Sequence, residues 1–307
     1  MSGDFDKAPI GYRLRQQKVY EAWLYILPMA LVLAFVALYP LLKNFYFSFT
    51  DAQLMEPEQA SWVGFENYAF LLTDSGWWNS VWKTLYFSVV SVAFETILGL
   101  GIALILNANL PTKGIMRAVV LVPWAIPTIV SARMWEWMFH DQYGVINQLA
   151  MSLGIISEKI AWTADPEWAM TAIIFVDVWK TTPFMTLLIL AGLQMLPKDI
   201  YEVAKVDNVP AWRVFWHITL PLLKPAILVA VVFRLLDALR MFDLAYVLTG
   251  SSESTITMSI FARKQMVDFQ DLGFGAAAST LLFFIVALVT VGYLYVSRSS
   301  LTSKESR

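Results

Sequence analysis

Six long runs of mainly apolar residues constrain this chain more than any other feature of its sequence. A helix needs roughly 20 mainly apolar residues to cross the ~30 Å hydrocarbon layer of a bilayer, and each run has about that length. Apolar residues make up 58% of the chain and charged residues only 15%, which excludes an ordinary soluble domain. We therefore expect an all-α membrane protein with six transmembrane helices. They cover about residues 22–42, 82–106, 117–138, 168–195, 223–247 and 275–297.

Lysine and arginine predict how the chain is oriented in the membrane. Thirteen of the twenty-two lie in one set of segments, namely 1–21, 107–117, 196–224 and 298–307. The loops on the other side, 43–81, 139–167 and 248–274, hold four. Because cytoplasmic loops carry the excess of these residues, both termini are expected to face the cytoplasm. The net charge of -2 argues against nucleic-acid binding, and the apolar composition makes membrane lipid the expected surroundings.

One membrane domain, residues 1–307 with an N-terminal cytoplasmic tail at 1–21, accounts for the whole sequence. The first apolar run is too long for a cleaved signal peptide and lacks a small-residue cleavage site, so we expect a retained helix. The absence of cysteine excludes disulfides and thiolate metal sites. In loop 139–167, the segment VINQLAMSLGII has apolar residues at helical spacing, which predicts a short helix along the outer membrane interface.

A polar, charged loop at 196–222 separates the fourth and fifth apolar runs. Residues 198–207 favour a helix, which Asn208 ends in the left-handed conformation. Pro210 suits the first turn of a second short helix, whose aromatic side chains are Trp212, Phe215 and Trp216. Pro221 and Pro225 are expected to end it. Such a helix-turn-helix suits a groove on a partner protein, and the alternative is an ordinary amphipathic loop with a solvated Glu202.

The same loop resembles the EAA loop of binding-protein-dependent ABC importer permeases. The resemblance rests on Glu202, Ala204, Asp207, Trp212, Phe215, Ile218, Leu220 and Pro221. The segments 61–72, 120–139, 178–204 and 233–250 are similar to carbohydrate-uptake permeases of the maltose type. WKTTPFM and FRLLDALRMFD look most like permeases for trehalose and similar glycosides. The resemblance implies a type I ABC importer fold with a cytoplasmic coupling loop.

By this resemblance, the loop would dock a separate ATPase subunit. Glu202 would pair with a basic residue of that subunit, and the residues that carry the coupling would be Glu202, Ala204, Asp207, Asn208, Trp212 and Phe215. The chain departs from the family pattern where Val203 replaces the first alanine and Asn208, Val209 and Pro210 replace Gly-Ala-Ser. Asparagine tolerates the left-handed conformation at modest strain, so the turn is expected to survive.

Catalytic motifs are missing from the sequence. It contains no GxxxxGK[ST] phosphate loop, so ATP and Mg²⁺ are expected on the partner ATPase. Its two histidines, His140 and His217, form no HExxH motif, and no GxSxG elbow occurs. We therefore expect no catalytic residue, no metal and no cofactor in this chain.

Charged residues inside the apolar runs mark a second candidate site. Such groups are costly at membrane depth and normally face a bundle interior or a water-filled pathway. On the fourth run, Asp177, Lys180, Thr181 and Phe184 fall within about 100° of one helix face. Arg133 and Glu136 are expected to pair with each other near the interface. The full set is Glu95, Arg133, Glu136, Asp177, Lys180, Arg234, Asp237, Arg240 and Asp243.

On the fifth run, helical spacing places Asp237 and Met241 on the face of Arg234, with Arg240 at its edge and Asp243 pointing away. The resemblance implies substrate contacts at Asp177, Thr181, Phe184, Asp237, Arg240 and Met241. Lys180 is included in the predicted pathway because it shares one face of the fourth run with the first three of these. Alternatively, Asp177, Lys180, Asp237 and Arg240 form interhelical ion pairs that position the bundle. Lys180 and Arg240 could also hold an anion, which leaves a charged glycoside or glycerol phosphate open as the substrate.

The function that the resemblance implies is that of a permease subunit forming half of a translocation pathway in a bacterial cytoplasmic (inner) membrane. The substrate would be a sugar, such as the disaccharide trehalose, or a glycoside or polyol. The implied partners are a second homologous permease, a dimer of cytoplasmic ATP-binding subunits and an extracytoplasmic substrate-binding protein. A self-contained secondary transporter or channel is the alternative, and it predicts inverted repeats.

Overall fold

The computed structural model describes residues 10–108 and 113–302, and most of this part of the chain is helical. Within it, β pairing is confined to two isolated bridges, Thr50 with Trp62 and Gln53 with Asp271. The prediction of an all-α membrane protein is therefore confirmed. Residues 1–9 and 303–307 of the predicted tails, and 109–112 of the loop between the second and third runs, lie outside the described residues.

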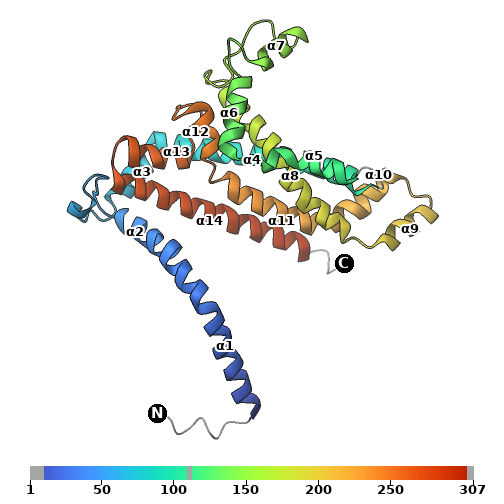
Figure 1. Cartoon of the computed structure of the whole chain (residues 1–307), viewed down its shortest axis with the longest axis horizontal. Coiled ribbons are helices and arrows are strands. Elements are labelled where there is room, and N and C mark those ends of the chain that lie inside the picture. Colours follow the sequence, from blue (N-terminus) through green and yellow to red (C-terminus); the bar gives the residue numbers. More distant parts are fainter. Residues whose placement is uncertain (1–9, 109–112, 303–307) are drawn as a thin grey trace.

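Four long helices run along the longest axis of the molecule (Figure 1). They are α4 (Ser75–Asn107), α8 (Ala169–Gln194), α11 (Leu220–Ala238) and α14 (Leu272–Thr302). The central one is α8, which packs against α4, α11 and α5 (Lys113–Ala125). It is also the most enclosed of the long helices, since 61% of its most apolar 18-residue stretch is buried inside the protein. The core of the bundle therefore lies around α8.

The first predicted span stands apart from this bundle. It consists of α1 (Ile10–Leu33), a π-helical turn (Ala34–Leu38) and α2 (Tyr39–Phe47). Of this span, α2 is the part that packs against the bundle, where it contacts α14. None of the most apolar 18-residue stretch of the span is buried inside the protein. Figure 1 shows α1 diverging from the other helices. Its apolar surface is thus left for lipid or for another protein.

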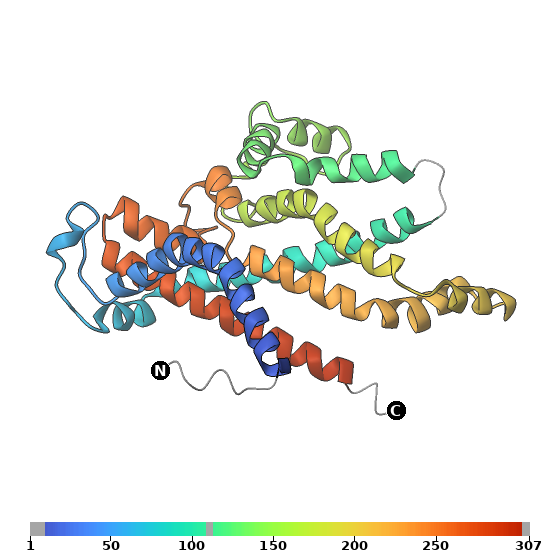
Figure 2. The same cartoon turned by 60° about the horizontal axis from the view of Figure 1, so that its bottom comes forward.

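Short helices cap the two ends of the bundle. At one end lie α3 (Glu66–Thr73), α12 (Asp243–Thr249) and α13 (Met258–Arg263), which a π-helical turn (Lys264–Asp268) follows. A single 3-10 turn (Pro57–Gln59) lies in the loop before α3. At the other end lie α9 (Lys198–Val206) and α10 (Ala211–Val214). Figure 2 shows, from another direction, that α9 and α10 lie at the end of the bundle far from α3, α12 and α13.

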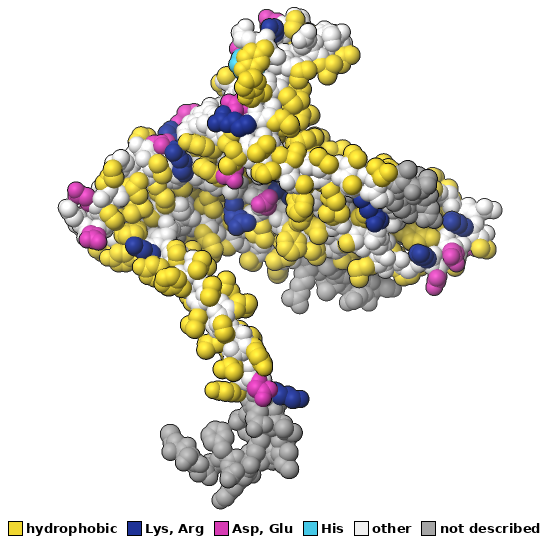
Figure 3. Space-filling model, in the orientation of Figure 1, with side chains coloured by type: hydrophobic (Ala, Val, Ile, Leu, Met, Phe, Trp, Pro, Cys, Tyr) yellow, Lys and Arg dark blue, Asp and Glu magenta, His cyan; other side chains and the backbone are white. Residues whose placement is uncertain are grey.

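The surface follows the pattern expected for a protein in lipid. Hydrophobic side chains cover most of the visible face, and the acidic and basic ones gather at the ends and in one group near the middle of the bundle (Figure 3). Among the described residues, five helices are long and apolar enough to cross a membrane, and a sixth span is counted if one bent pair is joined. This agrees with the six spans read from the sequence.

That bent pair corrects the expectation of one continuous helix at 117–138. α5 ends at Ala125, α6 (Thr128–Met138) begins three residues later, and their axes meet at 88°. Pro127 causes the break, because the residue before a proline is disfavoured in the helical conformation. As predicted, Arg133 and Glu136 on α6 pair with each other, at 2.6 Å. The segment VINQLAMS forms α7 (Val145–Ser152), which confirms the predicted short helix.

The fifth span differs from the prediction at both of its ends. At its start, α10, a π-helical turn (Phe215–Thr219) and α11 form one helix from Ala211 to Ala238. Pro221 and Pro225 therefore do not end the coupling helix, which is a correction. Pro221 occupies the first turn of α11, and in the π-helical turn the Leu220 N–H reaches back to the Phe215 carbonyl.

At its far end the fifth helix stops at Ala238 rather than continuing to 247. The amides of Arg240 and Met241 bond carbonyls three residues back, at Asp237 and Ala238, so the chain turns out of the helix. Thr257 Oγ1 then donates to the Met241 carbonyl at 3.1 Å. No proline or glycine marks this ending, which explains why apolar patterning missed it.

Close helix packing at the core depends on Gly192 in α8. A Cβ placed there would lie 2.4 Å from the Cβ of Ala226 in α11. Small residues at such crossings let helix backbones approach closely inside a membrane. Gly101 in α4 is a suitable control position for Gly192, because a Cβ placed there would have no other atom within 4 Å.

Gly192→Ala is therefore expected to destabilise the bundle by about 1–3 kcal/mol, because α8 and α11 must move apart to admit the methyl group. Gly101→Ala should be neutral or slightly stabilising, since alanine favours a helix over glycine. Thermal unfolding of the two purified variants in detergent measures the difference. Equal midpoints for Gly192→Ala and Gly101→Ala would contradict the packing argument.

Candidate functional site

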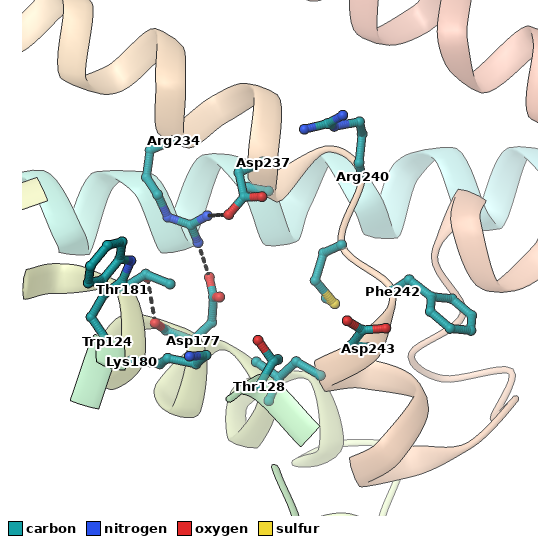
Figure 4. A pocket seen from close by; sticks show the side chains of 13 residues that line it. Trp124, Thr128, Asp177, Lys180, Thr181, Arg234, Asp237, Arg240, Phe242 and Asp243 are labelled. Atoms are coloured by element: carbon teal, nitrogen blue, oxygen red, sulfur yellow. Dashed lines mark hydrogen bonds and ion pairs between the residues drawn. The ribbon is translucent and has the colours of Figure 1, made fainter. Parts of the chain in front are cut away.

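A polar cavity of about 260 Å³ lies between α8, the end of α11 and the α5–α6 break. Figure 4 shows the side chains that converge on it from these elements. Six of the seven residues predicted for the substrate pathway line it, namely Asp177, Lys180, Thr181, Asp237, Arg240 and Met241. The remaining lining residues are Trp124, Thr128, Arg234, Ala238, Phe242, Asp243 and Leu244.

Arg234 is the hub of the charged groups at this cavity. Its guanidinium, which is almost fully buried, donates to Asp177 at 2.6 Å and to Asp237 at 2.7 Å (Figure 4). It also donates twice to Glu95 on α4, from Nε at 2.6 Å and from Nη2 at 3.0 Å. One cation thus ties α4, α8 and α11 together. Of the interhelical ion pairs considered from the sequence, Asp177 makes one, with Arg234, whereas the pair of Asp237 with Arg234 lies within α11. Within the described residues, Arg240 makes none.

Lys180 and Thr181 are also held in place. The Lys180 ammonium donates to the Ile126 carbonyl at 2.7 Å, an acceptor that the break between α5 and α6 leaves free of helix pairing. The Thr181 hydroxyl lies 2.7 Å from Glu95 Oε1 and 2.6 Å from the Asp177 carbonyl, so its single proton serves one of the two at a time. Lys180 therefore gives one of its three N–H donors to the backbone, and it makes none of the expected ion pairs within the part of the chain that the structure describes.

Two predicted placements need correction. Phe184 does not line the cavity, because its ring stacks on Trp124, with centroids 5.9 Å apart, and Trp124 forms the wall. Asp243 does line it, although a continuous helix would have turned it away. The end of α11 at Ala238 explains the second difference, since Arg240, Met241 and Asp243 lie beyond the helix whose spacing placed them. Arg240 is exposed and its Nε donates to the Leu236 carbonyl.

Sequence reasoning assigned no substrate role to Glu95 or Arg234, although both were noticed as charges inside apolar runs. That signal was sufficient to mark Glu95, whose side chain is fully buried. Its pairing with Arg234 could not be predicted, because the spacing of residues along one helix does not show which residues of another helix lie beside it. The carboxylates here bind a guanidinium, and in the described part of the chain no three acidic or histidine side chains are grouped as a metal site requires.

The predicted coupling loop forms a defined element at the far end of the bundle. Asn208 has φ 51°, the left-handed conformation expected of it. The Val209 amide bonds the Ala204 carbonyl at 2.9 Å and the Asn208 amide bonds the Lys205 carbonyl at 3.1 Å, which is the Schellman ending of a helix. Pro210 lies at the N-cap of α10, one position earlier than expected. The substitutions in this turn therefore leave its geometry intact.

The predicted coupling residues fall into two groups. Ala204 is buried and Phe215 half-buried, so these two hold the element against the bundle. Tyr201 helps, because its hydroxyl donates to Thr219 at 3.1 Å. Glu202, Asp207, Asn208 and Trp212 are exposed, and Trp212 has 60% of its surface accessible. Within the described chain Glu202 has neither a hydrogen bond nor an ion pair, so its carboxylate is available to a partner.

Comparison with known proteins identifies the family. Residues 95–300 match the family described as "Binding-protein-dependent transport system inner membrane component". The chain belongs to this family. It is 44% identical to the trehalose/maltose transport system permease protein of Thermococcus litoralis, over 93% of this chain and 96% of the relative. It is 39% identical to the sulfoquinovosyl glycerol transport system permease protein of Agrobacterium fabrum, over 91% of this chain and 90% of the relative.

The fold of this permease is also found in a solved structure. The match is a bacterial alginate ABC transporter in complex with alginate pentasaccharide-bound periplasmic protein, with a TM-score of 0.78 and 21% identity. It covers 92% of this chain and 96% of that one. The predicted ABC importer fold is thereby confirmed, and the permease is a membrane component rather than a self-contained secondary transporter or channel.

Arg234→Ala is expected to prevent accumulation of folded permease. It leaves three carboxylates without their shared cation, and breaking a buried charge pair costs about 3–5 kcal/mol. Arg240→Ala, which removes an exposed guanidinium, should assemble normally. Expression followed by size-exclusion chromatography in detergent compares the two arginines. A monodisperse Arg234→Ala permease with unchanged thermal stability would show that the buried cation is dispensable.

Proposed function

We propose that this chain is one of two permease subunits of an ABC importer that carries a sugar into the cell. The observation that carries the proposal is the single helix from Ala211 to Ala238. It begins with α10 of the coupling loop, which includes the exposed Trp212, and it holds the cavity residues Arg234 and Asp237 near its other end. Twenty-eight residues span about 40 Å, so a displacement at one end of a stiff helix is carried to the cavity.

The proposed mechanism needs partners at both ends of this helix. A dimer of cytoplasmic ATP-binding subunits, which bind ATP and Mg²⁺, closes and moves the α9–α10 element. A second homologous permease completes the pathway, and an extracytoplasmic binding protein delivers the sugar. A periplasmic protein with bound sugar in the solved alginate transporter supports the last of these. The lysine and arginine distribution supports a cytoplasmic position for both termini and for the coupling element.

The cavity suits a polyhydroxylated ligand. Asp177, Asp237 and Asp243 offer carboxylate oxygens, Thr128 and Thr181 offer hydroxyls, and Trp124 offers an aromatic face. Carboxylates accept hydrogen bonds from sugar hydroxyls, and aromatic faces pack against the apolar faces of sugar rings. The trehalose/maltose permease among the relatives supports a disaccharide such as trehalose. A glycoside or polyol has the same chemistry.

A sugar panel tests the proposed function. With both permeases, the ATPase dimer and the binding protein in proteoliposomes, ATP hydrolysis is expected to rise severalfold with the cognate sugar and to be accompanied by uptake. Omission of this chain should abolish both responses. Sugar-independent hydrolysis together with absent uptake, across disaccharides, glycosides and polyols, would overturn the assignment.

Glu202→Ala is expected to weaken attachment of the ATPase subunits while membrane insertion stays normal, because an exposed carboxylate suited to a basic partner residue is lost. Glu58→Ala is the matched control, since Glu58 is exposed in the 43–81 loop at the other end of the bundle. Co-purification of the ATPase with each tagged variant measures attachment. If the two variants retain equal amounts of ATPase, Glu202 is only a solvated loop residue.

A further inference from the structure

Glu95 is a buried carboxylate that the proposed pathway does not use directly. It lies in α4 with no exposed surface, and it does not line the cavity. Its Oε2 accepts from Arg234 Nε at 2.6 Å and its Oε1 accepts from Arg234 Nη2 at 3.0 Å. This two-point arrangement is the strong form of an arginine–carboxylate pair. Glu95 therefore engages Arg234 from the side away from the cavity.

The geometry leaves Arg234 little capacity for a ligand. A guanidinium has five N–H donors: one on Nε and two on each terminal nitrogen. Glu95 takes one on Nε and one on Nη2, Asp177 takes the other on Nη2, and Asp237 takes one on Nη1. A single Nη1 donor remains. Bidentate binding of a sulfonate or phosphate needs two adjacent donors, which Arg234 does not have free.

The other charges at the cavity do not favour an anion. Lys180 is buried and donates one of its three N–H groups to the Ile126 carbonyl, and Arg240 is the exposed cation of the lining. Asp177, Asp237 and Asp243 face the same space as these two and Arg234. The lining thus carries three acids and three bases, and Glu95 behind it adds a fourth negative charge. A sulfonate or phosphate would meet carboxylates, whereas sugar hydroxyls would find acceptors.

We propose that Glu95 is a positioning residue that sets substrate specificity: by occupying Arg234 from behind, it makes the cavity select uncharged polyhydroxylated sugars over anionic ones. The inference rests on the proposed function, because it assumes that the cavity holds the transported sugar. Sulfoquinovosyl glycerol, for which one of the relatives is named and which carries a sulfonate, supplies the anionic probe.

Loss of the Glu95 charge should change the selectivity of the cavity. Glu95→Gln keeps the shape of the side chain but removes its charge, and because the amide has a single acceptor oxygen, one of the two Arg234 donors that Glu95 held loses its partner. Glu95→Asp is the matched control, because it keeps the negative charge. A single charge acting over several ångströms at an effective dielectric constant of about 20 alters relative affinity by roughly tenfold or more.

The experiment uses the complete complex of two permeases and the ATPase dimer in nanodiscs, without the binding protein, so that only the membrane site selects. Saturation-transfer NMR with trehalose and with sulfoquinovosyl glycerol gives the two affinities. The wild type should favour trehalose, Glu95→Gln should shift the affinity ratio about tenfold toward the sulfonated sugar, and Glu95→Asp should stay close to the wild type. A purely structural role would lower stability and both affinities together and leave the ratio unchanged.

Two results would overturn the inference. One is an unchanged ratio in an assembled Glu95→Gln complex. The other is a wild type that binds sulfoquinovosyl glycerol as well as trehalose, which settles the question even where Glu95→Gln does not assemble. Failure of the proposed function looks different, because uptake and ATP hydrolysis of the wild type with its binding protein would then ignore every sugar.

Discussion

A single buried guanidinium organises this permease. Arg234 meets carboxylates from α4 and α8 and one from its own helix, so three of the long helices share one ionic centre inside an apolar bundle. Between lipid-facing helices the hydrophobic effect provides little attraction, because lipid tails are as apolar as the helices themselves. Specific polar contacts and close packing at small residues must fix the arrangement instead. Gly192 provides the second of these at the α8–α11 crossing.

The ionic centre also explains how a transport cavity and a stable bundle use the same residues. Asp177 and Asp237 each direct one oxygen to Arg234, and a carboxylate has further acceptor capacity for a ligand. The sequence alone suggested either substrate contacts or ion pairs for these residues. The structure shows that the ion pairs form while both side chains still line the cavity. The two interpretations are therefore compatible.

The sequence predicted features that depend on neighbouring residues, and it missed those that depend on contacts between residues far apart along the chain. The apolar runs predicted the six spans, and Asn208 predicted the left-handed turn of the coupling element, because both are local properties. The end of α11 at Ala238 could not be predicted, since the turn is held by Thr257, which lies at the start of a different helical segment, 16 residues after Met241. The same holds for the pairing of Glu95 with Arg234, 139 residues apart. The break at Pro127 carried a local signal that the apolar pattern concealed.

That break has a consequence for how such sequences can change. Pro127 ends the pairing of the α5 backbone inside the membrane, and the Lys180 ammonium binds the carbonyl that is left over at Ile126. A chain that replaced the proline and restored a straight helix would withdraw this acceptor and leave one N–H group of the ammonium without its partner at membrane depth. A chain that lost the lysine would leave a bare carbonyl at the bend. We therefore expect positions 127 and 180 to change together in evolution, although they lie 53 positions apart in the sequence.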